Sequence, residues 1–382
     1  MTRKIGVLTG GGDCPGLNNA IKWVTNSALD EGLEAARGHA YDVEGITYGW
    51  RGAVELALGH EHIQENVMHL DREVVRKIDR DGGTMLGSSR TNPFRFREDA
   101  AREPGDISDK VLRALQERYH AVVAIGGEDT LGVASKLNKM GLNIVGIPKT
   151  IDKDLGGTDI TLGFDSAVNY IKDALTRLLY TAGSHNMNYF VEIMGRHTGH
   201  LAFHGGMAGG AHFILVPECE FELDNLFAKI VHRKKSGKRS ERYTIVTVAE
   251  GARIKGQGEV KQGQVDAFGH PYLGGIALHL RNEFEKYDGG KHEARELVLG
   301  HLQRGGTPST FDMILGRHFG IKAINLVDEG RFGRIASLRN NRITDAPLED
   351  AGKTNYLDCK KCYDQQNLAP RLIADTMYFN TT

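Results

Sequence analysis

The chain repeats one local pattern: a short apolar run, then glycine or a polar cluster, then a segment with helical spacing. The run at residues 4–9 ends in Gly10-Gly11-Gly12, and apolar residues then recur at helical spacing between residues 17 and 28. Similar runs cover residues 120–125, 143–147, 189–194, 213–216, 244–248 and 297–299. Short buried strands that alternate with helices are typical of parallel sheets with helices on both faces. The pattern therefore predicts an α/β fold with mainly parallel sheets.

Length and composition limit the class of protein. The 382 residues exceed what one hydrophobic core usually serves, which predicts two domains. A net charge of −1 argues against a nucleic-acid-binding surface. No apolar run approaches the roughly 20 residues of a membrane helix, and no signal-peptide pattern is present. The cysteines form no disulfide framework, and Cys359 and Cys362 lack the second ligand pair of a zinc site, so we expect surface thiols in a cytoplasmic protein.

Phosphate is the ligand class that the glycine-rich segments favour. Open α/β sheets bind ligands at the carboxyl ends of their strands, and helix N-termini there offer N–H donors to anions. The dinucleotide fingerprint fails because Pro15 occupies the position of its last glycine, and the P-loop pattern fails at Pro347. The sequence thus predicts a phosphate ligand but supports neither a nicotinamide enzyme nor a P-loop enzyme.

The segment GIPKTIDKDLGG at residues 146–157 carries the most specific chemistry. Asp152 can take a proton from an attacking hydroxyl while Lys149 stabilises the moving group, as phosphoryl transfer requires. The alternative is that Asp152 and Asp154 cap a turn and that Lys149 is solvated.

Other loops supply the remaining parts of a phosphoryl-transfer site. Backbone donors around Gly11 and Gly12 could wrap a phosphoryl group, and Arg90 and Arg196 could neutralise its charge. The carboxylates that follow Gly126-Gly127 suggest Mg²⁺, which binds through one or two carboxylates plus substrate oxygens.

Seven segments together resemble the phosphofructokinase family along about residues 4–325: GVLTGGGDCPGLN, GGTMLGSSR, AIGGEDT, PKTIDKD, VEIMGRHTGH, VAEGA and GHLQRGGTPS. The resemblance implies two Rossmann-like domains with the active site in the cleft between them, and a homo-oligomer, either dimer or tetramer. We expect residues 1–163 with about 302–340 to bind the phosphoryl donor and residues 164–301 to bind the acceptor. Residues 341–382 are expected to form a C-terminal extension.

The resemblance also implies roles for individual residues. Asp152 is the expected general base, assisted by Thr150 and Asp154, while Glu128 helps to hold Mg²⁺ and Arg90 bridges the transferred phosphate. The expected donor-binding residues are Gly11, Gly12, Asp129, Thr130 and Lys149. The expected acceptor-binding residues are Met187, Met194, Gly195, Arg196, Glu250, Arg295, His301 and Arg304.

Two positions predict the phosphoryl donor. Members of the family that use ATP tend to have glycine where this chain has Asp129 and Lys149. An aspartate should crowd and repel the α-phosphate of a nucleotide, whereas a lysine should pair with the terminal charge of inorganic pyrophosphate. The pair resembles the pyrophosphate-dependent members, and Asp129 is the more discriminating residue because some ATP users also carry the lysine.

The acceptor stays open between two classes of small molecule. Arg295, His301 and Arg304 match basic residues that grip the phosphate of fructose 6-phosphate in the family, but Met187 stands where the family has a fourth, an arginine. Methionine offers no charge-assisted hydrogen bond, and Lys153 is a further departure. We expect fructose 6-phosphate, converted reversibly to fructose 1,6-bisphosphate, ahead of a neutral sugar or cyclitol such as myo-inositol. The family also includes ATP-dependent kinases and non-catalytic regulatory subunits, and both of these functions stay open for the chain.

Overall fold

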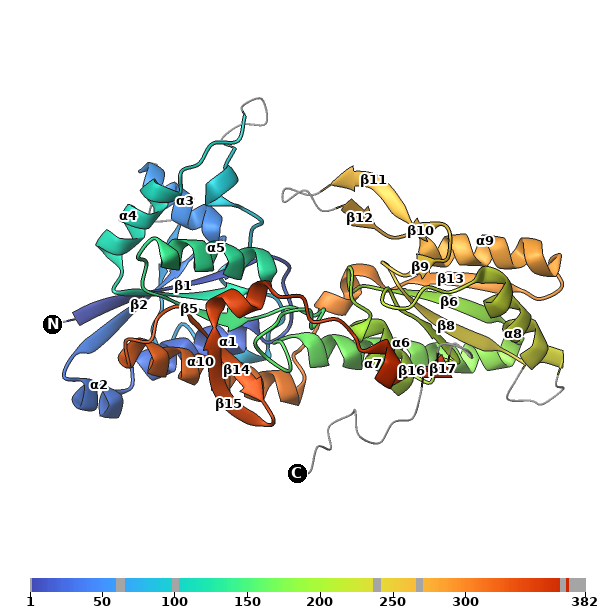
Figure 1. The fold of residues 1–382 in the computed structure, drawn as a ribbon. Helices are drawn as coiled ribbons and strands as arrows, with labels where there is room; N and C mark the ends of the chain where they lie inside the picture. Colours follow the sequence, from blue (N-terminus) through green and yellow to red (C-terminus); the bar gives the residue numbers. More distant parts are fainter. Residues whose placement is uncertain are drawn as a thin grey trace. The chain divides into compact units, whose positions relative to one another are not determined.

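The computed structural model describes residues 2–59, 66–97, 103–235, 242–265, 271–364 and 369–370. The chain forms two compact units (Figure 1). Unit 1 contains Met1–Thr150, Leu155–Asp165 and Arg304–Thr354, and unit 2 contains Ile151–Asp154, Ser166–Gln303 and Asn355–Thr382. The GIPKTIDKDLGG segment therefore contributes residues to both units.

Unit 1 is built on a seven-stranded sheet in the order β15-β14-β5-β4-β1-β2-β3. Its strands are β1 (Thr2–Gly10), β2 (Ala40–Ile46), β3 (Val67–His69), β4 (Ala121–Gly126), β5 (Ile144–Pro148), β14 (Arg334–Arg339) and β15 (Arg342–Pro347). The five central strands are parallel, and only the edge strands β3 and β15 run antiparallel to their neighbours. Every residue of β4 is buried, as expected for a strand covered on both faces.

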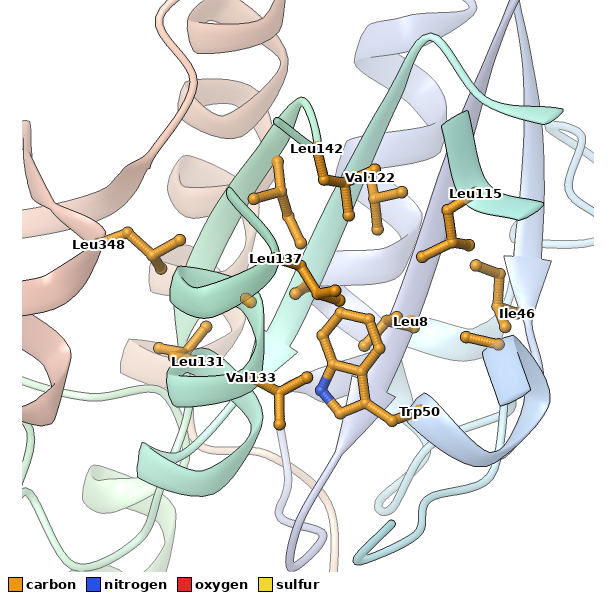
Figure 2. Packing of buried hydrophobic residues seen from close by; sticks show 14 of the residues in the cluster. Leu8, Ile46, Trp50, Leu115, Val122, Leu131, Val133, Leu137, Leu142 and Leu348 are labelled. Carbon is orange, nitrogen blue, oxygen red and sulfur yellow. The ribbon is translucent and has the colours of Figure 1, made fainter. Parts of the chain in front are cut away.

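Helices cover both faces of this sheet (Figure 1). They are α1 (Leu17–Ala28), α2 (Glu31–Arg37), α3 (Trp50–Leu58), α4 (Ser108–Arg118), α5 (Glu128–Lys139) and α10 (Thr310–Asp328), with the short 3₁₀ helices η2 (Ile78–Arg80), η3 (Pro93–Arg95) and η6 (Leu348–Gly352). Figure 2 shows Trp50 of α3 beside Leu8 of β1, in a cluster of buried side chains that also contains Leu115 of α4, Leu131 of α5 and Val122 of β4. Helices α1 and α10 pack together on the other face.

Unit 2 contains a parallel four-stranded sheet in the order β13-β6-β8-β7. Its strands are β6 (Asn188–Ile193), β7 (Phe213–Leu215), β8 (Thr244–Ala249) and β13 (Ala294–Val298), and its helices are α6 (Phe164–His185, which begins in unit 1), α7 (His200–Ala208), α8 (Leu223–Lys235) and α9 (Ile276–Asp288). Shorter elements are β9 (Arg253–Ile254), β10 (Gly258–Glu259), β11 (Lys261–Val265), β12 (Pro271–Leu273), η5 (Gly300–Arg304, whose last residue belongs to unit 1), α11 (Cys359–Cys362), β16 (Tyr363–Asp364) and β17 (Ala369–Pro370).

Aromatic packing joins the helices of unit 2 to its sheet. The ring of Phe284 in α9 lies 6.0 Å from that of Phe190 in β6 and 5.5 Å from that of Phe227 in α8. A methyl group on Gly206 of α7 would lie 2.5 Å from the hydroxyl oxygen of Thr247 in β8, so glycine permits this helix to approach the sheet closely.

The predicted α/β fold with mainly parallel sheets is confirmed, but two expectations from the sequence are wrong. Residues 341–354 do not begin an extension, because β15 pairs with β14 and η6 packs in the core of unit 1. Cys359 is buried rather than on the surface, and the side chain of Cys362 lies outside the described residues. In the part of the chain that the structure describes, no helix combines the length and apolar character needed to cross a bilayer.

Candidate active site

In unit 1, the neighbouring strands β1 and β4 end at glycines that pair in register, Gly10 and Gly126. The buried side chain of Thr130 fills the space that both glycines leave open. A methyl group on Gly10 would lie 2.5 Å from Thr130 Oγ1, and one on Gly126 would overlap the Thr130 Cβ. Thr130, expected to bind the donor, therefore has a packing role beneath the glycine-rich loop.

Lys149, which follows β5, is 2% exposed and lies under the same loop. Its Nζ donates to the backbone carbonyl of Gly10 at 3.1 Å and to that of Gly12. The alternative of a solvated lysine is thus wrong. A buried ammonium group beneath three consecutive glycines places positive charge where an anion can approach the backbone.

Both backbone polar groups of Gly11 form hydrogen bonds within unit 1. Gly11 adopts φ 77°, its N–H donates to the carbonyl of Ser89 at 3.1 Å, and its carbonyl accepts from Ser88 Oγ at 2.5 Å. The Gly11 N–H thus has a partner within unit 1, and its contact with a phosphate stays a prediction. These bonds fix the segment that precedes Arg90, whose side chain is exposed.

Arg304, expected among the acceptor-binding residues, belongs to unit 1 and contacts its glycine-rich loop. Its Nη1 donates to the carbonyl of Asp13 at 3.2 Å. A methyl group on Gly12 would overlap its guanidinium group, so a larger residue at this position would require the Arg304 side chain to move.

Glu128 and Asp129 form the first turn of α5, where carboxylates interact favourably with the helix dipole. Glu128 is exposed and Asp129 is half-buried. Within the described ranges, no three histidine, cysteine, aspartate or glutamate side chains gather into a metal site. One exposed carboxylate near the glycine-rich loop fits Mg²⁺, which usually completes its shell with substrate oxygens and water.

In unit 2, Glu250 follows β8 and binds the turn that follows β6. Its Oε1 accepts the N–H of Gly195 at 3.3 Å and that of Arg196 at 2.9 Å. The turn needs unusual backbone angles, with φ 146° at Gly195 and 50° at Arg196. Burial raises the pKa of Glu250 to about 7; the two N–H donors oppose this shift, and the charge of Asp152 adds to it.

Asp152 is 5% exposed and is tied to the same turn. Thr198 Oγ1 donates to the carbonyls of both Asp152, at 3.3 Å, and Gly195, at 3.2 Å. Asp154 and Thr150 are half-buried, and the Thr150 carbonyl accepts from Thr161 Oγ1 at 2.6 Å within unit 1. Unit 2 thus brings Asp152 close to Gly195, Arg196 and Glu250. Met194, which directly follows β6, is half-buried.

The predicted acceptor residues do not form one cluster within unit 2. Met187 precedes β6, and Arg295 pairs in register with Tyr189 at the same amino end of the sheet, where it forms an ion pair with Glu293. Tyr189 donates its hydroxyl to Met187 Sδ at 3.6 Å. The turn held by Glu250 lies beyond the opposite end of β6, which at about 3.3 Å per residue spans about 20 Å. His301 lies in η5, after the carboxyl end of β13, and is exposed.

Sequence reasoning missed several residues that shape the site. Thr198 and His200 lie in the VEIMGRHTGH segment but were not singled out, and Asn355 lies outside every recognised segment. Glu192, buried in β6, accepts the N–H groups of Gly275 and Ala277 and so caps the start of α9. Only Glu192 had a signal, a charged side chain in the otherwise apolar segment YFVEIM.

Comparison with known proteins identifies the family. The family model described as Phosphofructokinase matches residues 4–327. The chain is 46% identical to the pyrophosphate–fructose 6-phosphate 1-phosphotransferase of Dictyoglomus thermophilum, covering 93% of this chain and 95% of that protein. It is 43% identical to the ATP-dependent 6-phosphofructokinase 3 of Streptomyces coelicolor, covering 91% and 94%.

Solved structures show the same fold. The phosphofructokinase of Pichia pastoris in the T-state matches with a TM-score of 0.73 and 28% identity, over 92% of this chain and 35% of that one. The pyrophosphate-dependent phosphofructokinase of Marinobacter aquaeolei matches with a TM-score of 0.76 and 20% identity, over 95% and 88%. The chain belongs to the phosphofructokinase family.

Proposed function

We propose that the protein is a Mg²⁺-dependent phosphotransferase that moves a phosphoryl group reversibly from inorganic pyrophosphate to a sugar hydroxyl. The observation that carries this proposal is the buried ammonium of Lys149 beneath the glycine-rich loop, with Asp129 in the first turn of the adjacent helix. Relatives named for pyrophosphate and for ATP both share more than 40% of their residues with this chain, so overall similarity does not choose the donor.

The donor-binding residues proposed in unit 1 are Gly12, Arg90, Asp129 and Lys149. Lys149 holds the loop and supplies positive charge to a small anion. The carboxylate of Asp129 disfavours a nucleotide, because the negatively charged α-phosphate of the nucleotide would have to lie beside it. Glu128 would hold Mg²⁺, which neutralises charge on the transferred group when it is bound.

The acceptor chemistry is assigned to unit 2. We propose that Asp152 accepts the proton of the attacking hydroxyl, while Asp154 assists and Arg196, Glu250 and His301 orient the acceptor. Asp152 lies only three residues after Lys149, so the covalent chain links the base to the donor-holding lysine.

Fructose 6-phosphate is the proposed acceptor, and a homo-oligomer is part of the proposal. Met187 and Arg295 lie at the opposite end of the unit 2 sheet from Arg196 and Glu250. We propose a dimer or tetramer in which Arg295 of one copy completes the acceptor site of another. A neutral sugar or cyclitol stays the second candidate, because Met187 provides no charge for a sugar phosphate. We propose that the protein acts on one of these small molecules in the cytoplasm.

The experiment compares donors in the wild type and in Asp129→Gly, alone and combined with Lys149→Gly. Orthophosphate or ADP release is followed with a panel of sugar phosphates, free sugars and polyols. We expect the substitutions to lower the rate of orthophosphate release from pyrophosphate and to allow some ADP release from ATP. An unchanged donor preference in the double variant would refute the proposed role of this pair, and the acceptor panel decides between a phosphorylated and a neutral sugar.

A further inference from the structure

The loop that carries Asp152 is held by a residue from outside the 4–327 stretch that matches the family. Three consecutive carbonyls of this loop each accept a hydrogen bond. Thr198 Oγ1 donates to the carbonyl of Asp152 at 3.3 Å. Asn355 supplies the other two, from its side-chain Nδ2 to Lys153 at 3.1 Å and from its backbone N–H to Asp154 at 2.8 Å.

The middle residue of the loop needs this support. Lys153 has φ 58°, a left-handed backbone conformation that residues other than glycine rarely adopt unless the surrounding structure constrains them. The Asn355 amide binds the carbonyl of this strained residue. Losing that bond would let the backbone next to Asp152 relax toward ordinary angles.

Asn355 is itself fixed from the other side by α7. Its carbonyl lies 2.9 Å from Nε2 of His200 and can only accept, so Nε2 carries the proton. Burial, followed by the charge of Lys153, lowers the pKa of His200 to about 4, so its ring is neutral near pH 7. The hydrogen bond therefore persists across the neutral range.

A second anchor follows two residues later in the chain. The N–H of Leu357 donates to Glu218 Oε1 at 3.0 Å, and the same oxygen accepts the N–H of Gly199 at 3.0 Å. Gly199 directly follows Thr198, whose hydroxyl holds the Asp152 carbonyl. Residues 355–357, the strap, thus bind both the loop that carries Asp152 and the turn that supports it.

We propose that Asn355 is a positioning residue that fixes the backbone of residues 152–154, so that the Asp152 carboxylate keeps its orientation toward the acceptor hydroxyl. This inference rests on the proposed role of Asp152 as the base. Asn355 contacts the loop through its backbone and touches no reacting atom.

The test is a double-mutant cycle between Asn355→Asp and Asp152→Asn. Asn355→Asp keeps the shape of the side chain but replaces the donor with an oxygen. In the wild-type background we expect kcat to fall about tenfold, while the KM for pyrophosphate changes less than about twofold. In the Asp152→Asn background the same change should alter the residual kcat less than about twofold, because the group being positioned is gone.

The matched control is Asn143→Asp, whose amide also donates to a backbone carbonyl, that of His120 at 3.0 Å, in unit 1. Its kcat should stay at the wild-type value. If Asn355→Asp melts below the assay temperature, Asn355→Ala takes its place, since it adds no charge.

Two results would overturn the proposal: a wild-type kcat for the Asn355 variant, or an equal loss in both backgrounds, which would indicate general damage to the fold. Near-normal turnover of Asp152→Asn alone would instead refute the proposed role of Asp152 as the base. Because this variant leaves Asn355 unchanged, its result distinguishes failure of the proposed function from failure of the Asn355 inference.

Discussion

Replacing Lys149 with methionine tests whether the buried ammonium holds the donor loop. Methionine has a similar length and is apolar, so the change removes the Nζ donors while it fills most of the volume. The carbonyls of Gly10 and Gly12 then lose a charged donor.

The expected loss of stability follows from these two bonds. Hydrogen bonds to a charged group are worth about 1.5–3 kcal/mol each. The variant no longer has to bury a charge, and this gain offsets part of the lost hydrogen-bond free energy. We expect a net loss of about 2–3 kcal/mol, which lowers the melting temperature of a unit of this size by about 4–12 °C. Without the positive charge, the KM for pyrophosphate should rise at least about tenfold, equivalent to about 1.4 kcal/mol of binding.

Thermal unfolding by circular dichroism and orthophosphate release measure the two effects on the same preparations. Lys139→Met is the matched control, since Lys139 is 67% exposed and pairs with Glu349 at 3.5 Å, an interaction worth less than about 1 kcal/mol. Wild-type melting and a wild-type KM for Lys149→Met would refute the reasoning. Reduced stability with an unchanged KM would contradict the role in donor binding.

Three further predictions concern the base, a buried carboxyl group and the metal. Asp152→Asn should fold normally and lower turnover by about two to four decades, as orthophosphate release will show. Since the pKa of Glu250 is raised from 4.5 to about 7, its contribution to stability should be present below pH 4.5 and lost as the pH rises through about 7. Glu250→Gln should flatten the plot of unfolding midpoint against pH between pH 4.5 and about 7. An unchanged slope in that range would contradict the raised pKa of Glu250. Chelation with EDTA should abolish turnover without changing the melting temperature of the ligand-free protein, because Mg²⁺ completes its shell with substrate oxygens.

The strands that position the site were predictable because each contains a short, mostly apolar run that is followed by glycine or a polar cluster. β1, β4 and β8 are examples, with completely buried central residues. The pairing of β14 with β15 was not predicted, since β15 is a polar, half-buried edge strand and β14 buries only three residues between arginines.

The environment of single side chains was harder to predict than the strands. Nothing in the sequence indicates that Lys149 is buried, because its partners are backbone carbonyls. The Asn355 contact joins residues 202 positions apart and has no periodic signal. The separation of Met187 from Arg196 follows from the length of β6, which only a placed strand reveals.

The central claim is that the protein uses inorganic pyrophosphate as its phosphoryl donor. The most direct test is the kcat/KM of the wild-type protein for pyrophosphate and for ATP, measured with Mg²⁺ and saturating fructose 6-phosphate. We predict that pyrophosphate exceeds ATP by at least about a hundredfold. An equal or higher value for ATP would contradict the assignment of Asp129 and Lys149.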